Sequence, residues 1–63
     1  MIPHKTILVV DDEPMLREAD ASYLEQKGVR VLTAETGSQA LAIFERESVH
    51  FVILDLICWE IKA

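Results

Sequence analysis

The sequence has few of the residues that stabilise secreted mini-domains or bind nucleic acid. It contains one cysteine among 63 residues, so no disulfide can form within the chain, and a reducing compartment such as the cytoplasm is expected. Its 6 Lys and Arg against 11 Asp and Glu give a net charge of −5, which argues against direct binding of nucleic acid. Its apolar runs are far shorter than the roughly 20 residues of a membrane span. We therefore expect one small cytoplasmic domain that contacts neither membrane nor nucleic acid.

Glycine is also scarce, and its absence from one segment excludes a class of cofactor site. A dinucleotide-binding fold carries G-x-G-x-x-G after its first strand. Here the first apolar run is followed by Asp11, Asp12, Glu13 and Pro14, an acidic segment without glycine that opposes a pyrophosphate. The same segment does not fit the D-x-D-x-T motif of haloacid dehalogenase phosphatases. Nothing in the pattern predicts an enzyme.

The first part of the chain alternates strand-like and helix-like segments. Residues 6–10, TILVV, are rich in strand formers and include four consecutive apolar residues, Ile7 to Val10, as in a strand covered on both faces. A helix is predicted from Pro14, which suits a first helical position, to Lys27, with Gly28 as its stop. The helix should bury the apolar residues at helical spacing, which are Leu16, Ala19, Tyr23 and Leu24.

The second part repeats the alternation. A strand is predicted over residues 29–34, and Thr36 with Gln39 has the spacing of a capping box that starts a helix at Gly37. The apolar face of this helix consists of Ala40, Leu41, Ile43 and Phe44. Residues 50–54 form a third predicted strand, and the segment after it is short and ambiguous. The order β-α-β-α-β predicts an α/β fold with a parallel sheet and right-handed crossovers.

Acidic residues follow two of the predicted strands. Asp11 and Asp12 come after the first, and Asp55 comes after the third. In a sheet ordered 2-1-3 these strand ends lie side by side, where open α/β sheets bind ligands. Three converging carboxylates favour a bound cation, and oxygen ligands suit Mg²⁺. Glu13 is interpreted instead as a charge at the start of the helix.

The segments "ILVVDDEP", "GVRVLTAETGSQAL" and "FVILDL" resemble the first half of a response-regulator receiver domain, over roughly residues 5–57. The resemblance implies half of a flavodoxin-like sheet with strand order 2-1-3. It implies that Asp55 accepts a phosphoryl group from a sensor histidine kinase or a phosphotransfer protein. It also implies a Mg²⁺ cofactor bound by Asp12, Asp55 and the backbone carbonyl of Ile57, with Asp11 acting through water.

The end of the chain departs from the receiver pattern. After Asp55, the usual methionine and proline positions hold Cys58 and Trp59, and the usual glycine position holds Ala63. We therefore expect a truncated receiver over residues 1–57 and a tail over 58–63. The hydroxyl residue and lysine that touch the phosphoryl group in such domains have no counterpart, so labelling by acetyl phosphate should be slow or undetectable. The alternative is a receiver-derived interaction or oligomerisation module, or a fragment, without phosphotransfer.

The same resemblance suggests self-association. The third strand, residues 50–54, would become an apolar edge, and Ile7, Val9, Val52 and Leu54 would lose their cover. Two third strands could then pair antiparallel in a homodimer, with Trp59 and Ile61 near the contact. Exchange of a helix is the competing geometry. Trp59 could instead cover the bare surface of its own chain.

Overall fold

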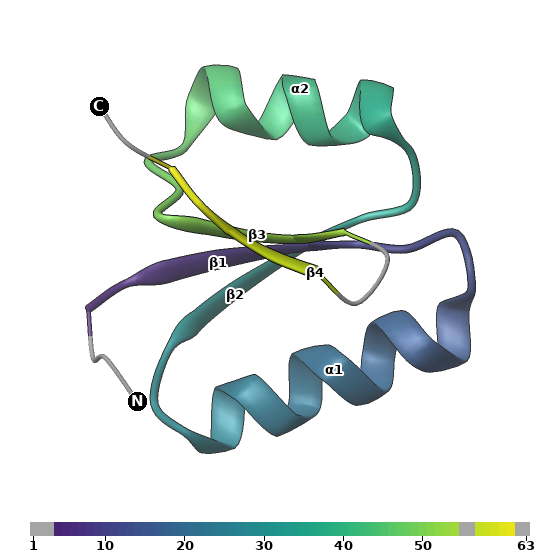
Figure 1. Ribbon diagram of the computed structural model, residues 1–63, viewed down its shortest axis with the longest axis vertical. Coiled ribbons are helices and arrows are strands. Elements are labelled where there is room, and N and C mark those ends of the chain that lie inside the picture. Colours follow the sequence, from purple (N-terminus) through teal and green to yellow (C-terminus); the bar gives the residue numbers. More distant parts are fainter. Residues whose placement is uncertain (1–3, 55–56, 62–63) are drawn as a thin grey trace.

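A four-stranded sheet with one helix on each face forms the framework of the computed structural model, which describes residues 4–54 and 57–61 (Figure 1). Its elements are β1 (Thr6–Val10), α1 (Pro14–Gln26), β2 (Arg30–Ala34), α2 (Gly37–Arg46), β3 (Phe51–Leu54) and β4 (Ile57–Glu60). The strand order is β2-β1-β3-β4, with β1 parallel to β2 and β3, and β4 antiparallel to β3. The predicted α/β class and the order 2-1-3 are confirmed, with one strand added.

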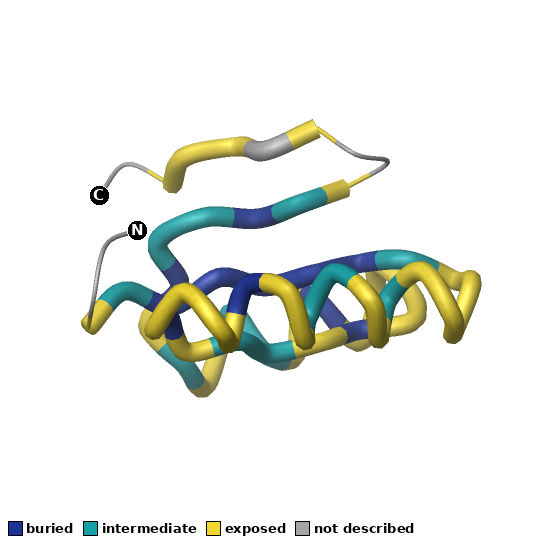
Figure 2. The backbone as a smooth tube through the Cα atoms, turned by 90° about the horizontal axis from the view of Figure 1, so that it is seen from below, coloured by how far each residue is buried: buried dark blue, intermediate teal, exposed yellow. Residues whose placement is uncertain are grey.

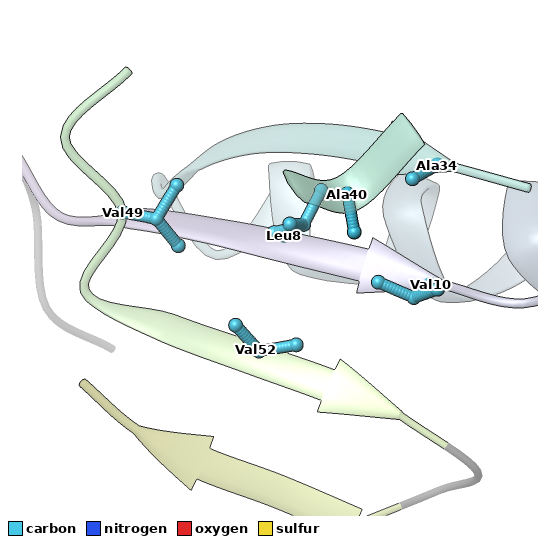
Figure 3. Packing of buried hydrophobic residues seen from close by; sticks show 6 residues of the cluster. All are labelled: Leu8, Val10, Ala34, Ala40, Val49 and Val52. Atoms are coloured by element: carbon cyan, nitrogen blue, oxygen red, sulfur yellow. The ribbon is translucent and has the colours of Figure 1, made fainter. Parts of the chain in front are cut away.

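The central strand β1 is buried along its whole length, as its uninterrupted apolar run predicts (Figure 2). Successive side chains point to opposite faces, so β1 contributes to two cores. Leu8 and Val10 pack with α2, in a cluster completed by Ala34, Ala40, Val49 and Val52 (Figure 3). Ile7 and Val9 lie in the second cluster, with Leu24 of α1 and Val29. The strand that leads to the acidic segment is therefore fixed from both sides.

Helix α1 begins and ends where the sequence predicts, to within a residue, and α2 begins at the predicted Gly37. Glu13 is extended before Pro14, and Gly28 follows α1 with φ +88°. At α2, the Thr36 Oγ1 accepts the N–H of Gln39 at 3.2 Å, and the Gln39 Oε1 accepts the N–H of Glu35 at 2.7 Å. The capping pair therefore operates, although the Gln39 side chain reaches one residue further back than in the usual capping box.

The two glycines offer a matched test of backbone strain. A Cβ added at either position meets no atom within 4 Å, but only Gly28 has positive φ. We expect Gly28→Ala to lower the free energy of unfolding by about 1–2 kcal/mol, because an L-residue is disfavoured there. Gly37→Ala should be neutral or stabilising, because Gly37 opens a helix. Urea denaturation followed by circular dichroism would measure both, and equal losses would contradict the assignment.

The face that α1 turns to the sheet differs from the predicted one. Leu16, Ala19 and Tyr23 are exposed, and Leu24 is the only buried member of the predicted stripe. The half-buried positions are Arg17, Asp20 and Ala21, which with Leu24 follow the spacing i, i+3, i+4, i+7. Leu41 of α2 was also predicted to be buried and is exposed. The rest of the α2 prediction is confirmed, with Ala40 buried and Ile43 and Phe44 half-buried.

The prediction that the third strand is an exposed edge is wrong. β3 lies between β1 and β4, and it pairs with β4 from Phe51↔Glu60 to Leu54↔Ile57. The segment predicted as a tail from residue 58 includes most of β4, which occupies the edge in place of β3. Pairing of third strands between two copies is therefore blocked. Ile7, Val9 and Val52, expected to lose their cover, are buried within one chain, whereas Leu54 is exposed as predicted.

The two histidines differ in their surroundings. His4 is exposed, whereas the half-buried His50 accepts the N–H of Thr6 on its Nδ1 at 3.0 Å. The His50 N–H in turn donates to the carbonyl of Thr6 at 2.9 Å. His50 therefore joins the starts of β1 and β3 and is structural. No helix within residues 4–54 or 57–61 is long and apolar enough to cross a membrane.

Candidate functional site

The acidic segment leaves the sheet at the carboxyl end of β1. The backbone N–H of Asp11 donates to the carbonyl of Ala34 at 3.1 Å, which continues the pairing with β2 by one residue. The Oδ1 of Asp11 then accepts the N–H of Glu13 at 2.9 Å, a side-chain turn that redirects the backbone toward α1. Asp11 is half-buried and Asp12 is exposed. The first acid therefore shapes the loop, and the second presents its carboxylate to solvent.

A basic side chain that the sequence did not single out supports this loop. Nη1 of Arg17 donates to the backbone carbonyl of Asp11 at 2.7 Å. Arg17 lies in the first turn of α1, six residues after Asp11, so its guanidinium reaches back across the loop. This contact holds the carbonyl group of Asp11, which belongs to the peptide bond between Asp11 and Asp12. The sequence gives little indication of this contact, because an arginine in a first helical turn ordinarily extends into solvent.

Both helices begin at the same edge of the sheet as the acidic segment (Figure 1). In this βα arrangement each parallel strand runs toward the edge and each helix returns from it. Free backbone N–H groups and the positive ends of the helix dipoles of α1 and α2 therefore lie there. These partial charges offset part of the repulsion among Asp11, Asp12 and Glu13. The edge can hold a concentration of negative charge that an isolated loop could not.

The ends of β1 and β3 lie side by side, as the predicted site requires. Val10 and Leu54 are register partners, and Asp11 follows the first of them directly. Asp55 follows Leu54 in the chain but lies outside the described residues. Ile57, whose carbonyl is a predicted ligand, is the first residue of β4 and pairs with Leu54. The roles of Asp11, Asp12, Asp55 and Ile57 stay predictions.

The donor set present at this edge fits a hard divalent cation. Asp12 offers a solvent-facing carboxylate, and Asp11 keeps one carboxylate oxygen that the turn to Glu13 does not use. Mg²⁺ favours one or two carboxylates together with several waters. Among residues 4–54 and 57–61, no three His, Cys, Asp or Glu side chains gather closely enough to hold a metal. The third predicted carboxylate, that of Asp55, is not among those residues.

Comparison with known proteins identifies the family. The family model described as "Response regulator receiver domain" matches residues 7–58. This chain belongs to the response regulator receiver family. The match begins in β1 and extends into β4, so it spans the acidic segment, both helices and Asp55. The sequence-based resemblance is confirmed.

Several curated relatives are similar to this chain over most of its length. It is 41% identical over 51 residues to "Response regulator RR06" of Streptococcus pneumoniae, a match that covers 81% of this chain and 24% of that protein. It is 42% identical over 52 residues to "Probable transcriptional regulatory protein TcrX" of Mycobacterium tuberculosis, covering 82% and 22%. A third relative, at 38% identity over 52 residues, is "CAI-1 autoinducer sensor kinase/phosphatase CqsS" of Vibrio cholerae, covering 82% and 8%.

The chain therefore spans less than a quarter of the length of these relatives. No solved structure gives a significant match. The shared part is the receiver segment, so the comparisons support the chemistry of a receiver. They do not carry over the output functions of the longer proteins.

Proposed function

We propose that this chain is a phosphoacceptor module of a two-component phosphorelay. Asp55 accepts a phosphoryl group from a sensor histidine kinase or phosphotransfer protein, and Mg²⁺ assists. The observation that carries the proposal is the family match over residues 7–58, which includes all three acids that the chemistry needs. The pairing of Val10 with Leu54 supports it, because the residues that follow β1 and β3 then leave adjacent strand ends.

In the proposed reaction, an oxygen of the Asp55 carboxylate is the nucleophile. It attacks the phosphorus of a phosphohistidine, an O–P bond forms, and the P–N bond breaks. The leaving imidazole nitrogen keeps the electron pair and takes a proton from water. The product is an acyl phosphate on Asp55. The chain acts as an acceptor, and we do not propose that it is an enzyme acting on a separate substrate.

Asp11 and Asp12 have different parts in this proposal. The exposed carboxylate of Asp12 is the direct metal ligand, together with Asp55 and the carbonyl of Ile57. Asp11 uses one oxygen to hold the Glu13 N–H, which suits a supporting role through water. When bound, Mg²⁺ neutralises the charge of the approaching phosphoryl oxygens. Arg17 keeps the Asp11 carbonyl in place and so positions the Asp12 carboxylate.

The serious alternative is a receiver-derived interaction module without phosphotransfer. The exposed Trp59 favours this reading, because exposed tryptophans are often anchors for a partner. The two functions differ in their need for metal. A phosphoacceptor requires a Mg²⁺ site at the carboxyl edge of the sheet, whereas an interaction module does not.

A Mg²⁺ titration tests the proposal. If the acids bind Mg²⁺ in the folded chain, mass action should stabilise it by about 1.4 kcal/mol at ten times the dissociation constant. Asp12→Ala should remove this gain, and Glu25→Ala, which removes an exposed acid from α1, should keep it. Thermal unfolding in millimolar Mg²⁺, with Ca²⁺ for comparison, provides the measurement. A melting temperature that does not respond to Mg²⁺ in the folded wild-type chain would argue for the interaction module.

A further inference from the structure

The two edges of the sheet differ in how well they are protected against pairing with another strand. At the β2 edge, Arg30 forms an ion pair with Glu47 at 2.9 Å, and a charged side chain at an edge discourages pairing. At the other edge, β4 has Ile57 and Trp59 among its four residues, and Ile61 follows. An edge strand carries unpaired N–H and C=O groups along its outer side. The β4 edge therefore offers a template for an added strand.

An apolar strip accompanies this edge. Val52 packs in the cluster on the α2 face of the sheet, and the register pairs Val52 with Trp59 and Leu54 with Ile57. Register partners and alternate residues share a face, so the strip lies on the α2 side. We define the β4 apolar strip as four residues, each 41–56% exposed: Leu54, Ile57, Trp59 and Ile61.

Neither helix covers this strip. Within the described residues, both α1 and α2 lie closest to β1 and β2, and the four side chains of the strip stay exposed. The described part of β4 is accordingly exposed in Figure 2, whereas β1 is buried. Exposed apolar side chains beside unpaired backbone groups fit a partner that is itself a β-strand with an apolar face.

The backbone groups that β4 leaves free follow from one hydrogen bond. The N–H of Ile61 donates to the carbonyl of His50 at 2.8 Å, so Ile61 directs its backbone toward β3. In an antiparallel ladder this direction alternates, and Trp59 and Ile57 also face β3. The outward N–H and C=O groups are therefore those of Cys58 and Glu60. A strand added to β4 must bond to these two residues.

The apolar residues of the β4 edge form a palindromic pattern, which is the same in both chain directions. The segment from Ile57 to Ile61 has the pattern Ile-x-Trp-x-Ile, with Trp59 at its centre. If a second copy runs antiparallel with the two-fold axis at Trp59, Cys58 bonds to Glu60 of the other copy. Trp59 then faces its own counterpart at a non-hydrogen-bonded position, where side chains are closest. Ile57 faces Ile61, so the strip meets an identical strip.

Other registers are less favourable for reasons of charge and length. A two-fold axis at Glu60 places two carboxylates directly opposite each other, which is destabilising. An axis at Cys58 pairs Ile57 with Trp59 but leaves Ile61 without a partner among residues 57–61. The register centred on Trp59 avoids the charge contact and uses all three apolar side chains of the segment.

From this complementarity we propose that the β4 edge is a self-association surface, which joins two copies of this chain into one continuous sheet. The axis is perpendicular to the sheet, so the α2 faces of both copies lie on the same side. The β4 apolar strips then form one apolar patch centred on the two Trp59 side chains. The occupant is a second β4, and not a second β3 as the sequence had suggested.

The size and charge of the contact set its strength. One strand and four partly exposed side chains make a small interface, so the dimer belongs to the weak, reversible class. Each copy has a net charge of −5, and the two copies repel each other at low ionic strength. Added salt should therefore tighten the dimer, in contrast to an association held by ion pairs.

Sedimentation equilibrium across a concentration series tests the proposal. We expect a reversible monomer–dimer equilibrium, with a blue shift in the emission of Trp59, the only tryptophan, as the dimer forms. Trp59→Ala should weaken association at least about tenfold, as for a central aromatic anchor. The matched control is Tyr23→Ala on α1, which removes an aromatic side chain of similar exposure, 60% against 56% for Trp59, and should leave association unchanged.

Disulfide trapping tests the register directly. In a Cys58→Ser background, Ile57→Cys together with Ile61→Cys places thiols of the two copies opposite each other about 4.5 Å apart at Cα, within the range that disulfides span, and keeps Trp59. Mild oxidation should link the two copies, whereas Tyr23→Cys in the same background should not. Circular dichroism would confirm that each variant is folded. The proposal is overturned if the folded wild-type chain stays monomeric at high concentration, or if Tyr23→Ala weakens the dimer while Trp59→Ala does not.

Discussion

Replacing Leu8 by alanine is expected to unfold a large fraction of the chain. Leu8 is 0% exposed at the centre of β1, where its register partners are Leu32 of β2 and Val52 of β3. A Leu→Ala change in a packed core costs about 2–5 kcal/mol, because the cavity left behind closes only in part. A core of this size rarely supplies more than ~3–5 kcal/mol in total. The cost is therefore comparable with the whole stability of the domain.

The matched control is Leu41→Ala, which removes the same atoms from α2, where the side chain is 66% exposed. Its effect should lie within about 0.5 kcal/mol, as for most surface substitutions. Urea denaturation followed by far-ultraviolet circular dichroism compares the two variants with the wild-type chain. Similar losses from both changes would contradict the assignment of Leu8 to the centre of the core.

The sequence predicted β1 and the helix ends because their signals are local. Four consecutive apolar residues, Ile7 to Val10, fit a strand covered on both faces, and β1 is buried throughout. Thr36 and Gly28 act on backbone groups within a few residues of themselves, so their roles could be predicted without knowing the tertiary fold. Only the order of the strands needed a resemblance to a known family.

The buried face of α1 could not be predicted from hydrophobicity alone. The stripe Leu16–Ala19–Tyr23 and the observed face differ by a rotation of one residue and share Leu24. Arg17 is half-buried on the observed face, and its guanidinium donates to the Asp11 carbonyl. The choice depends on a polar contact between α1 and the preceding loop, which no count of apolar residues contains.

The β4 strand was missed for a different reason. The alternation Ile57-x-Trp59-x-Ile61 is a strand pattern that is visible in the sequence. The same segment departs from the receiver pattern at Cys58 and Trp59, and this departure predicted a tail and not a strand. The alternation also does not say which neighbour the strand pairs with. The pairing partner is determined by the tertiary fold: without β4, the outer backbone groups of β3 would be unpaired.

Phosphorylation of this chain by acetyl phosphate should depend entirely on Asp55. With Mg²⁺ present, we expect slow incorporation of one phosphoryl group, and none in Asp55→Asn. The amide keeps the shape of the side chain but lacks the anionic oxygen that attacks phosphorus. Intact-mass measurement over time, followed by peptide mapping, would give both the rate and the position.

Asp12 should control the rate of the same reaction without being its target. In the proposed site, its exposed carboxylate helps to hold the cation that neutralises the phosphoryl oxygens. Loss of one such charge-stabilising interaction typically slows a reaction about 10²–10³-fold, so Asp12→Ala should reduce labelling by that factor. Glu25→Ala, which removes a distant exposed acid, should label at the wild-type rate.

Two results would count against this assignment. Labelling that persists in Asp55→Asn would move the acceptor to another acid, with Asp11 and Asp12 the first to examine. Labelling that proceeds equally well without Mg²⁺ would contradict the proposal that the three acids at this edge of the sheet form a Mg²⁺ site. Fast incorporation that requires both Asp55 and Mg²⁺ would keep the acceptor but show that the chain already contains enough positive charge to stabilise the transferring group. Arg17, which contacts the Asp11 carbonyl, is one candidate for that charge.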